Sequence, residues 1–219
     1  MKSSTKLFAA LIVCSGLSAN AAEIRLGEVL SAGFAQTRLG DLPSGFETGY
    51  QGRWGAGVAL ELTWGRHSAL LLSPGYLKKG GTLSDPSGEP ESKYDFGYLE
   101  VPLEFRYAFG EHSVRPYLLA GTSVGFLLTA KLRPGTRPET DMEDVTRGVD
   151  VSLLAGVGLQ VPGRWGRGFF DIVLLEGVRD INALGTMEIR QRSILVRAGW
   201  TFGLKRHGQA GADAASGGR

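Results

Sequence analysis

Three ionisable residues interrupt one of the most hydrophobic stretches of the sequence, YLEVPLEFRYAFG at residues 98–110. Glu100, Glu104 and Arg106 alternate there with large apolar residues, so in an extended chain the charged and apolar side chains occupy opposite faces. Carboxylates and a guanidinium at this spacing can pair with charges on neighbouring strands, whereas each would be costly to bury alone. The pattern predicts a hydrogen-bonded network that fills the space on one face of the sheet and links its strands. A path for protons or ions is the competing interpretation.

The other residues capable of chemistry do not form a recognisable active site. His67, His112 and His207 lie in expected turns or in the C-terminal segment, and the adjacent pair His112–Ser113 does not constitute a catalytic dyad. The segment DMED at 141–144 lacks the glycine and the final glutamate of a calcium loop. The glycines of GVGLQVPG lie in an expected strand without the following helix of a dinucleotide site. The sequence therefore predicts no catalytic residue, metal or cofactor, and a protein that is not an enzyme.

Apolar residues recur at every second position from residue 22 to residue 204, which is the period of a β-strand. Pro74 and Pro102 lie within this pattern and lack a backbone donor, so we expect a bulge or an unpaired carbonyl beside them. The alternation predicts eight strands, near residues 23–36, 52–64, 67–79, 93–109, 115–131, 148–161, 168–181 and 187–204.

The links between these strands alternate in length. Long links at 37–51, 80–92 and 132–147 are each followed by a short one, such as residues 65–66 or 110–114. Short periplasmic turns and longer outer loops are typical of outer-membrane barrels, and this order requires an even number of strands. The sequence thus predicts an all-β fold, an eight-stranded antiparallel up-and-down transmembrane β-barrel.

Two features of the strands place their apolar faces against lipid. The opposite face is rich in small residues, and the sequence has 33 glycines, about twice the usual share; small residues suit the narrow interior of an eight-stranded barrel. Aromatic residues gather near the expected strand ends, as in the interfacial girdles of membrane barrels. The girdle is predicted to contain Trp54, Trp64, Tyr107, Phe109, Trp165, Phe170, Trp200 and Phe202, and Tyr76, Tyr94, Phe96 and Phe169 are expected in the same belts.

The polar faces then line the lumen of the barrel. Eight strands enclose an interior that side chains fill, so we expect a paired charge network and no open pore. Its predicted members are Glu61, Glu100, Glu104, Arg106, Asp150, Asp171 and Arg197.

The first residues have the layout of a secretory signal. Two lysines precede an apolar stretch at 7–17, and small residues including Ala19-Asn20-Ala21 follow. The apolar stretch is shorter than the roughly 20 residues that span a bilayer. We therefore expect residues 1–21 to be a signal peptide, with cleavage after Ala22 as the alternative.

Removal of this segment leaves a neutral chain without cysteine. Cys14, the only cysteine, lies within the expected signal, and loss of Lys2 and Lys6 from the 24 basic residues leaves 22, equal to the 22 acidic residues. This balance gives no argument for a nucleic-acid partner. Residues 22–204 are expected to form the barrel. Residues 205–219 are predicted to be a disordered periplasmic tail, because GQAGADAASGG has almost nothing to bury.

Four segments carry a resemblance to a known family. YLEVPLEFRYAFG is followed by VRPYLLAGTSVGFLLTAK and SILVRAGWTFGL, and EGVRDIN at 176–182 is similar to the family's Gly-Leu-Thr-Asn-Ile segment, with substitutions. In their order along the chain, these segments resemble the porin-like small outer-membrane β-barrel domain of Gram-negative bacteria, the group with OmpX-like and PorT-like proteins. The chain departs from the family where a polar segment follows Phe202 and where Glu176 falls on the lipid-facing side.

The resemblance implies a location in the Gram-negative cell outer membrane and insertion by the barrel-assembly machinery. We expect a monomer with a structural or surface-interaction role, in contact with outer-membrane lipids including lipopolysaccharide; the sequence does not identify its surface partner. The alternative is a barrel that binds or transports a small hydrophobic ligand, either in the membrane or as a periplasmic lipocalin-like protein.

Overall fold

The computed structural model describes residues 23–40, 44–84, 86, 92–135, 138–183 and 188–204. The expected signal peptide at 1–21 and the expected tail at 205–219 lie outside these residues. No helix in the described part of the chain is long and apolar enough to cross a membrane.

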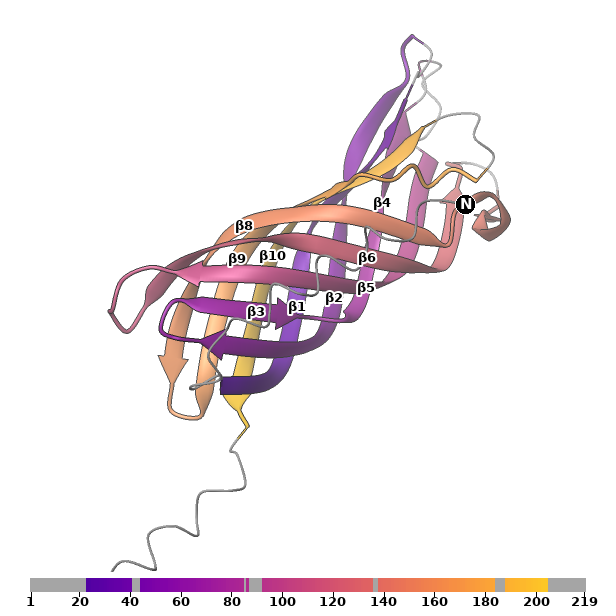
Figure 1. Ribbon diagram of the computed structural model, residues 1–219. Helices are drawn as coiled ribbons and strands as arrows, with labels where there is room; N and C mark the ends of the chain where they lie inside the picture. Colours follow the sequence, from indigo (N-terminus) through magenta and orange to yellow (C-terminus); the bar gives the residue numbers. More distant parts are fainter. Residues whose placement is uncertain are drawn as a thin grey trace, which may run out of the picture.

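Long antiparallel strands make up nearly all of the described chain (Figure 1). In chain order the elements are β1 (Glu23–Leu39), β2 (Glu47–Trp64), β3 (Ser68–Leu72), β4 (Gly75–Ser84), β5 (Ser92–Ala108), β6 (Arg115–Arg133), β7 (Thr140–Asp141), the short 3₁₀ helix η2 (Glu143–Val145), β8 (Val149–Gly163), β9 (Gly166–Gly177) and β10 (Ile189–Gly203).

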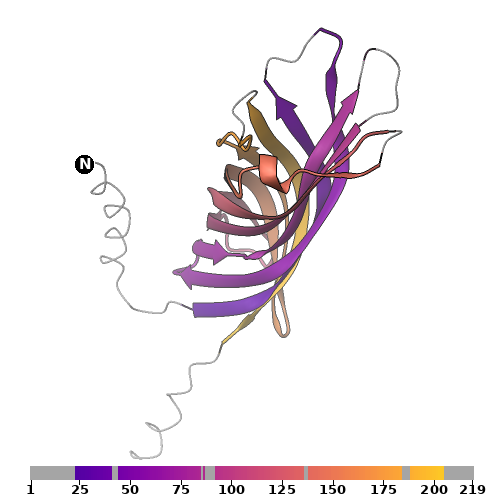
Figure 2. The same ribbon diagram turned by 90° about the vertical axis from the view of Figure 1, so that its right-hand side faces the viewer.

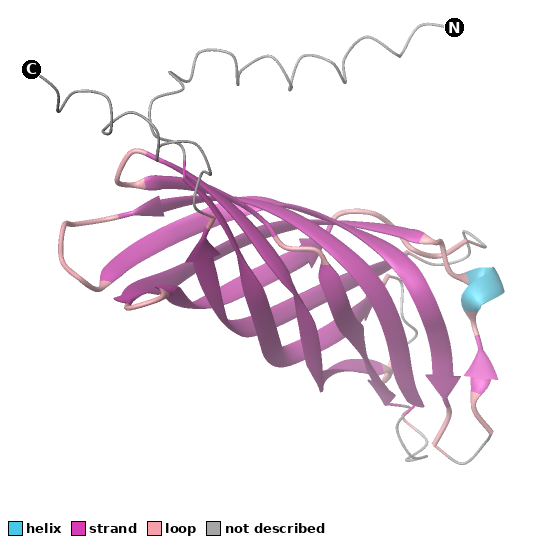
Figure 3. Cartoon of the chain, turned by 90° about the horizontal axis from the view of Figure 1, so that it is seen from below, coloured by secondary structure: helices cyan, strands magenta, loops and turns pink. Residues whose placement is uncertain are grey.

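The sheet closes on itself because β1 pairs with both β2 and β10. The remaining strands follow in chain order, with β3 and β4 sharing one position between β2 and β5, so the ring has eight members. Figure 3 shows the strands running around the ring at a common tilt. The predicted eight-stranded up-and-down antiparallel barrel is confirmed.

The two ends of the barrel differ. One end, here called the short-turn end, carries the turns at 65–67, 109–114 and 164–165 together with the first and last described residues, where Leu204 N donates to Ile24 O at 2.9 Å. The opposite, long-loop end carries the links that follow β1, β4, β6 and β9. In Figure 2 the β1–β2 and β4–β5 hairpins rise beyond the rest of the ring at this end.

Pro74 interrupts one strand without shifting its register, and Pro102 lies within the continuous strand β5. Ser73 and Pro74 separate β3 from β4, yet Leu60↔Leu72 and Gly57↔Gly75 belong to the same pairing register with β2. Ser73 N donates to Pro102 O at 3.1 Å, and Val58 N donates to Pro74 O at 3.0 Å. The expected bulge is absent, because the strands keep one register across both prolines. The alternative, an unpaired carbonyl, agrees with the pairing: neither proline has an N–H to donate in return to Ser73 O or Val58 O.

A true bulge lies elsewhere, in β6. Gly97 pairs with Thr129 but Tyr98 pairs with Leu127, which leaves Leu128 as an extra residue. One extra residue reverses which face the following side chains occupy. Thr129 and Lys131, which the alternation places in the lumen, are consequently exposed, and Ala130 is buried instead.

Candidate functional site

The structure places all seven residues of the expected lumen network inside the ring, where each is almost completely buried. They do not form one continuous network. Four of them make an arginine cluster, defined as Glu104, Arg106, Asp171 and Arg197. Glu100 and Asp150 instead meet Lys79 in a lysine cluster, and Glu61 pairs with Arg167 at 3.1 Å near the short-turn end.

Arg197 is the centre of the arginine cluster. From β10 it reaches two other strands, since Nη2 donates to Glu104 Oε2 at 2.8 Å and Nε donates to Asp171 Oδ1 at 2.7 Å. The planar guanidinium binds Glu104 through two nitrogens, an arrangement that fixes direction as well as distance. These bonds tie β5, β9 and β10 together through the interior of the barrel.

Arg106 completes the same cluster between two aromatic rings. Its Nη2 lies 3.2 Å from Asp171 Oδ2, and its guanidinium lies 5.0 Å from the Tyr117 ring and 4.4 Å from the Phe169 ring. Tyr117 OH also donates to Asp171 Oδ2, at 2.7 Å. Gly158 leaves room for this ring, because a Cβ there would lie 2.4 Å from Tyr117 Cζ.

The lysine cluster lies in the same lumen but has a different composition. Lys79 Nζ is 2.6 Å from Glu100 Oε1 and 2.8 Å from Asp150 Oδ2, and the lysine is only 1% exposed. Ser123 Oγ donates to the other oxygen of Glu100, and the ammonium lies 5.1 Å from the Tyr98 ring. One ammonium therefore faces two carboxylates.

Sequence reasoning missed several charged members of the lumen. Lys79 is paired as described above, and at the long-loop end Arg53 pairs with Asp95 at 2.8 Å. The alternation contains a signal for both cations: Arg53 lies on the same face of β2 as Glu61, and Lys79 lies on the same face of β4 as Leu77. Lys79 could not be assigned to the lumen from the sequence, because Pro74 suggested a change of register between Leu72 and Lys79.

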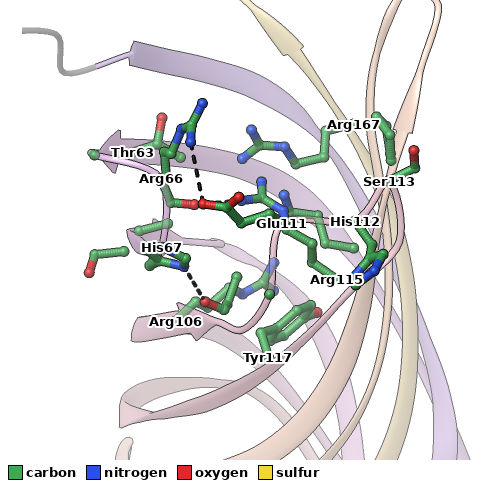
Figure 4. Close-up of a pocket in the computed structure, with 17 residues that line it drawn as sticks. Thr63, Arg66, His67, Arg106, Glu111, His112, Ser113, Arg115, Tyr117 and Arg167 are labelled. Carbon is green, nitrogen blue, oxygen red and sulfur yellow. Dashed lines mark hydrogen bonds and ion pairs between the residues drawn. The ribbon is translucent and has the colours of Figure 1, made fainter.

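The mouth of the barrel at the short-turn end is a basic hollow of about 420 Å³. Two turns shape its rim. They contain Gly65 and Gly110, whose φ values of 63° and 74° lie in the left-handed backbone region that favours glycine. Figure 4 shows side chains from both turns and from the adjoining strands pointing into the hollow. Its charged lining residues are Arg66, Arg106, Glu111, Arg115 and Arg167.

Hydrogen bonds hold the arginines of this hollow in place. Arg115 Nη1 donates to Arg66 O, and His67 Nδ1–H donates to Ala108 O at 2.8 Å. With its amide oxygen turned toward its neighbours, Gln160 accepts from Arg115 Nη2 at 2.8 Å and from Arg167 Nε at 2.9 Å. The hollow ends at Arg106 and Tyr117, where the arginine cluster begins.

The residues of the expected girdle lie on the outside of the barrel. Most are exposed, with Trp165 at 72%, and two are half-buried: Trp64 and Trp200. The wider set of aromatics contains two errors. Phe169 is buried against Arg106, because it shares the inward face of β9 with Asp171, and Phe96 is 3% exposed, beneath Met142 and beside Tyr98. Both residues lie at the height of a girdle along the barrel axis, but their side chains point inward, so neither belongs to the girdle.

A sequence model described as an outer membrane protein β-barrel domain matches residues 19–182. No curated protein sequence matches the chain. Among solved structures, Neisserial surface protein A is 13% identical, with a TM-score of 0.49 over 81% of this chain and 97% of that chain. Ail of Yersinia pestis, in complex with the heparin analogue sucrose octasulfate, is 17% identical, with a TM-score of 0.43 over 83% of this chain and 99% of that chain. Outer membrane protein W of E. coli is 14% identical, with a TM-score of 0.39 over 84% of this chain and all of that chain.

Proposed function

Because the chain belongs to the outer membrane protein β-barrel domain family, we propose that it is a closed, non-conducting barrel that displays its long loops at the cell surface. In this orientation the short-turn end faces the periplasm, as the alternation of turn lengths favours. The role is that of a stable surface-interaction scaffold, and no catalytic step is assigned to it.

The arginine cluster is the observation that supports a closed barrel. Arg197 crosses the lumen from β10 to Glu104 on β5, and Asp171 and Glu104 are 0% exposed. The hollow at the short-turn end stops at Arg106, whose guanidinium is held between two rings. An ion entering from that end would have to separate buried charge pairs, which is expensive. Steady conductance is therefore not expected.

The long-loop end has features suited to a surface role. Glu139 binds Lys131 at 2.6 Å and Arg133 at 2.7 Å, and on the outer wall Glu176 lies between Arg38 and Arg192. Hydrogen bonds from the two basic side chains lower the pKa of Glu139, so its carboxylate remains charged. Outer-membrane lipids, including lipopolysaccharide, are among the proposed partners, because the outward-facing apolar wall of a barrel of this family lies against lipid.

The alternative of a hydrophobic-ligand barrel has weaker support. An apolar hollow lies within the ring beside Leu77, Leu154 and Leu195, but its volume is only about 50 Å³. Small-molecule pockets are commonly about 300–1,000 Å³. Side chains fill this part of the lumen too well for a ligand of ordinary size.

Conductance measurements test the proposal directly. The full-length protein, refolded and inserted into planar bilayers, should give no steady current. A stable open channel of porin size would contradict a closed barrel.

Proteolysis of intact cells tests the orientation of the barrel. Cleavage should occur within the long loops. Cleavage confined to residues 110–114 would show that the short-turn end faces the outside.

A further inference from the structure

The hollow at the short-turn end has an excess of positive charge in its described lining. Among the described residues that line it, four are arginines and one, Glu111, is a carboxylate. Arginine is always charged and presents five donors in a rigid fork, so each unmatched guanidinium favours an acidic partner.

Most of the neighbouring carboxylates are already engaged. Glu61 binds Arg167 at 3.1 Å and Asp171 binds Arg106 at 3.2 Å. Arg115 is different: it donates to the carbonyl of Arg66 and to the amide oxygen of Gln160, both of which are neutral. Within the described residues its positive charge therefore has no carboxylate against it.

Two further arginines leave nitrogen donors without acceptors. Arg106 Nε is buried and has no partner in the described part of the chain, although the residue is only 5% exposed and lines the hollow. Arg25, near the start of β1 and outside the lining of the hollow, also leaves Nε and Nη1 without a partner in the described residues. A group that offers several acceptor oxygens and negative charge would complement this arrangement.

We propose that the hollow binds an oxyanion of the phosphate class, seated between Arg115 and Arg167. Gln160 holds these two guanidinium groups on either side of its amide oxygen, at 2.8 and 2.9 Å. A concave wall lined by one sign of charge focuses its field on such a ligand. The volume, about 420 Å³, is sufficient for a diphosphate group.

Glu111 is the residue that competes with this ligand. It lies 3.4 Å from Arg66, and both side chains are more than three-quarters exposed, at 77% and 79%. An exposed ion pair of this kind contributes little free energy and separates easily. The incoming anion takes over Arg66, and Glu111 turns out toward solvent.

Isothermal titration with inorganic pyrophosphate tests the site. The full-length protein is used in a nonionic maltoside detergent, at constant ionic strength maintained with chloride, because phosphocholine detergents carry the competing group. Arg115→Gln should weaken binding at least tenfold. Glu111→Gln should tighten binding several-fold, which a purely structural role for these residues does not predict. Arg179→Gln, the same change at an exposed residue of the opposite end, should leave affinity unchanged.

A second variant keeps the test decisive if Arg115→Gln fails to fold. Ser113 is exposed at the rim of the hollow, so Ser113→Glu removes no buried contact but should abolish pyrophosphate binding by repulsion. Nanodiscs with and without phosphatidylglycerol show whether the bound phosphate group belongs to a lipid or to a free compound. If this lipid competes with pyrophosphate, the ligand is a lipid headgroup. If it does not compete, the ligand is a free phosphate compound. Wild-type protein that binds pyrophosphate no better than chloride, or binding unaffected by Ser113→Glu, would overturn the proposal.

Discussion

The two charged clusters of the lumen have similar burial but different charge balance. In the arginine cluster two guanidinium groups face two carboxylates, and every carboxylate accepts from Arg197. In the lysine cluster one ammonium faces two carboxylates, and Asp150 Oδ1 has no hydrogen-bond partner among the residues that the structure describes. Burial therefore does not by itself tell how much a charged residue stabilises the barrel; the number of opposite charges around it must be counted as well.

The clusters also differ in how firmly they hold the strands. A guanidinium donates in fixed directions, so Arg197 ties together the three strands that carry Glu104, Asp171 and itself. The ammonium of Lys79 is a point charge at the end of a flexible chain, and its site is completed by a serine hydroxyl on Glu100. We expect the arginine cluster to be the rigid fastening of the lumen and the lysine cluster to tolerate more change in its acids.

Removal of the single cation from the lysine cluster should have one of the two largest effects. Lys79→Met leaves Glu100 and Asp150 facing each other without an opposite charge, and we expect a loss of about 3–5 kcal/mol in the free energy of unfolding. Urea titration of the detergent-solubilised protein, followed by tryptophan fluorescence, measures it. Lys78→Met is the matched control, since the neighbouring lysine makes no ion pair within the described residues. Equal effects of the two substitutions would show that burial of Lys79 is not what matters.

Removal of one of two cations from the arginine cluster should cost less. Arg106→Leu leaves Arg197 bound to both carboxylates, and the vacated space borders a hollow that water can enter. We expect a loss of about 3 kcal/mol, the lower end of the range for a broken buried pair. Phe105→Leu, on the lipid-facing side of the same strand, should cost considerably less, because an apolar side chain stays in an apolar solvent. Similar urea midpoints for the two variants would contradict the assignment of Arg106 to the lumen-facing side of β5 and of Phe105 to the lipid-facing side.

A pair of tyrosines gives a smaller expected effect, and each substitution removes a single hydroxyl group from one cluster. Tyr117 OH donates to Asp171 at 2.7 Å, whereas Tyr98 OH, beside Lys79, is buried without a partner in the described chain. Tyr117→Phe should destabilise the barrel by about 1–2 kcal/mol, and Tyr98→Phe should be neutral or slightly stabilising. Thermal unfolding of both variants in the same detergent provides the comparison. A larger loss for Tyr98→Phe would contradict these hydrogen-bond assignments.

The sequence predicted the strands and the inward face of most of them because a period of two residues is a local property. Glu104 and Asp171 could be assigned to the lumen from their immediate neighbours alone. Their partners could not be assigned, because contacts across the lumen depend on the tilt and stagger of the closed ring. The link from Arg197 to Glu104 joins residues 93 positions apart.

Local irregularities account for most of the errors. The extra residue at Leu128 turns the side chain of Lys131 from the lumen to the outside of the barrel. The composition of β6 contains no signal for this bulge. Pro74 signals an irregularity that the backbone absorbs without a change of register, so Lys79 remains inside. The basic hollow was also missed. Arg66 and Arg115 are brought together by turns that are separate in sequence, and alternation along a single strand carries no information about them.

The most direct test of this account compares Asp171→Asn with Asp150→Asn in one set of urea titrations. Both aspartates are 0% exposed, and the chemical change is the same. Asp171→Asn removes a carboxylate from a balanced cluster and leaves excess positive charge, so we expect a loss of about 3–5 kcal/mol. Asp150→Asn removes the surplus charge of the lysine cluster while Lys79 keeps Glu100, and the change should stay within about 1 kcal/mol of zero. Equal losses, or a larger loss for Asp150→Asn, would contradict the claim that charge balance decides what each lumen cluster contributes.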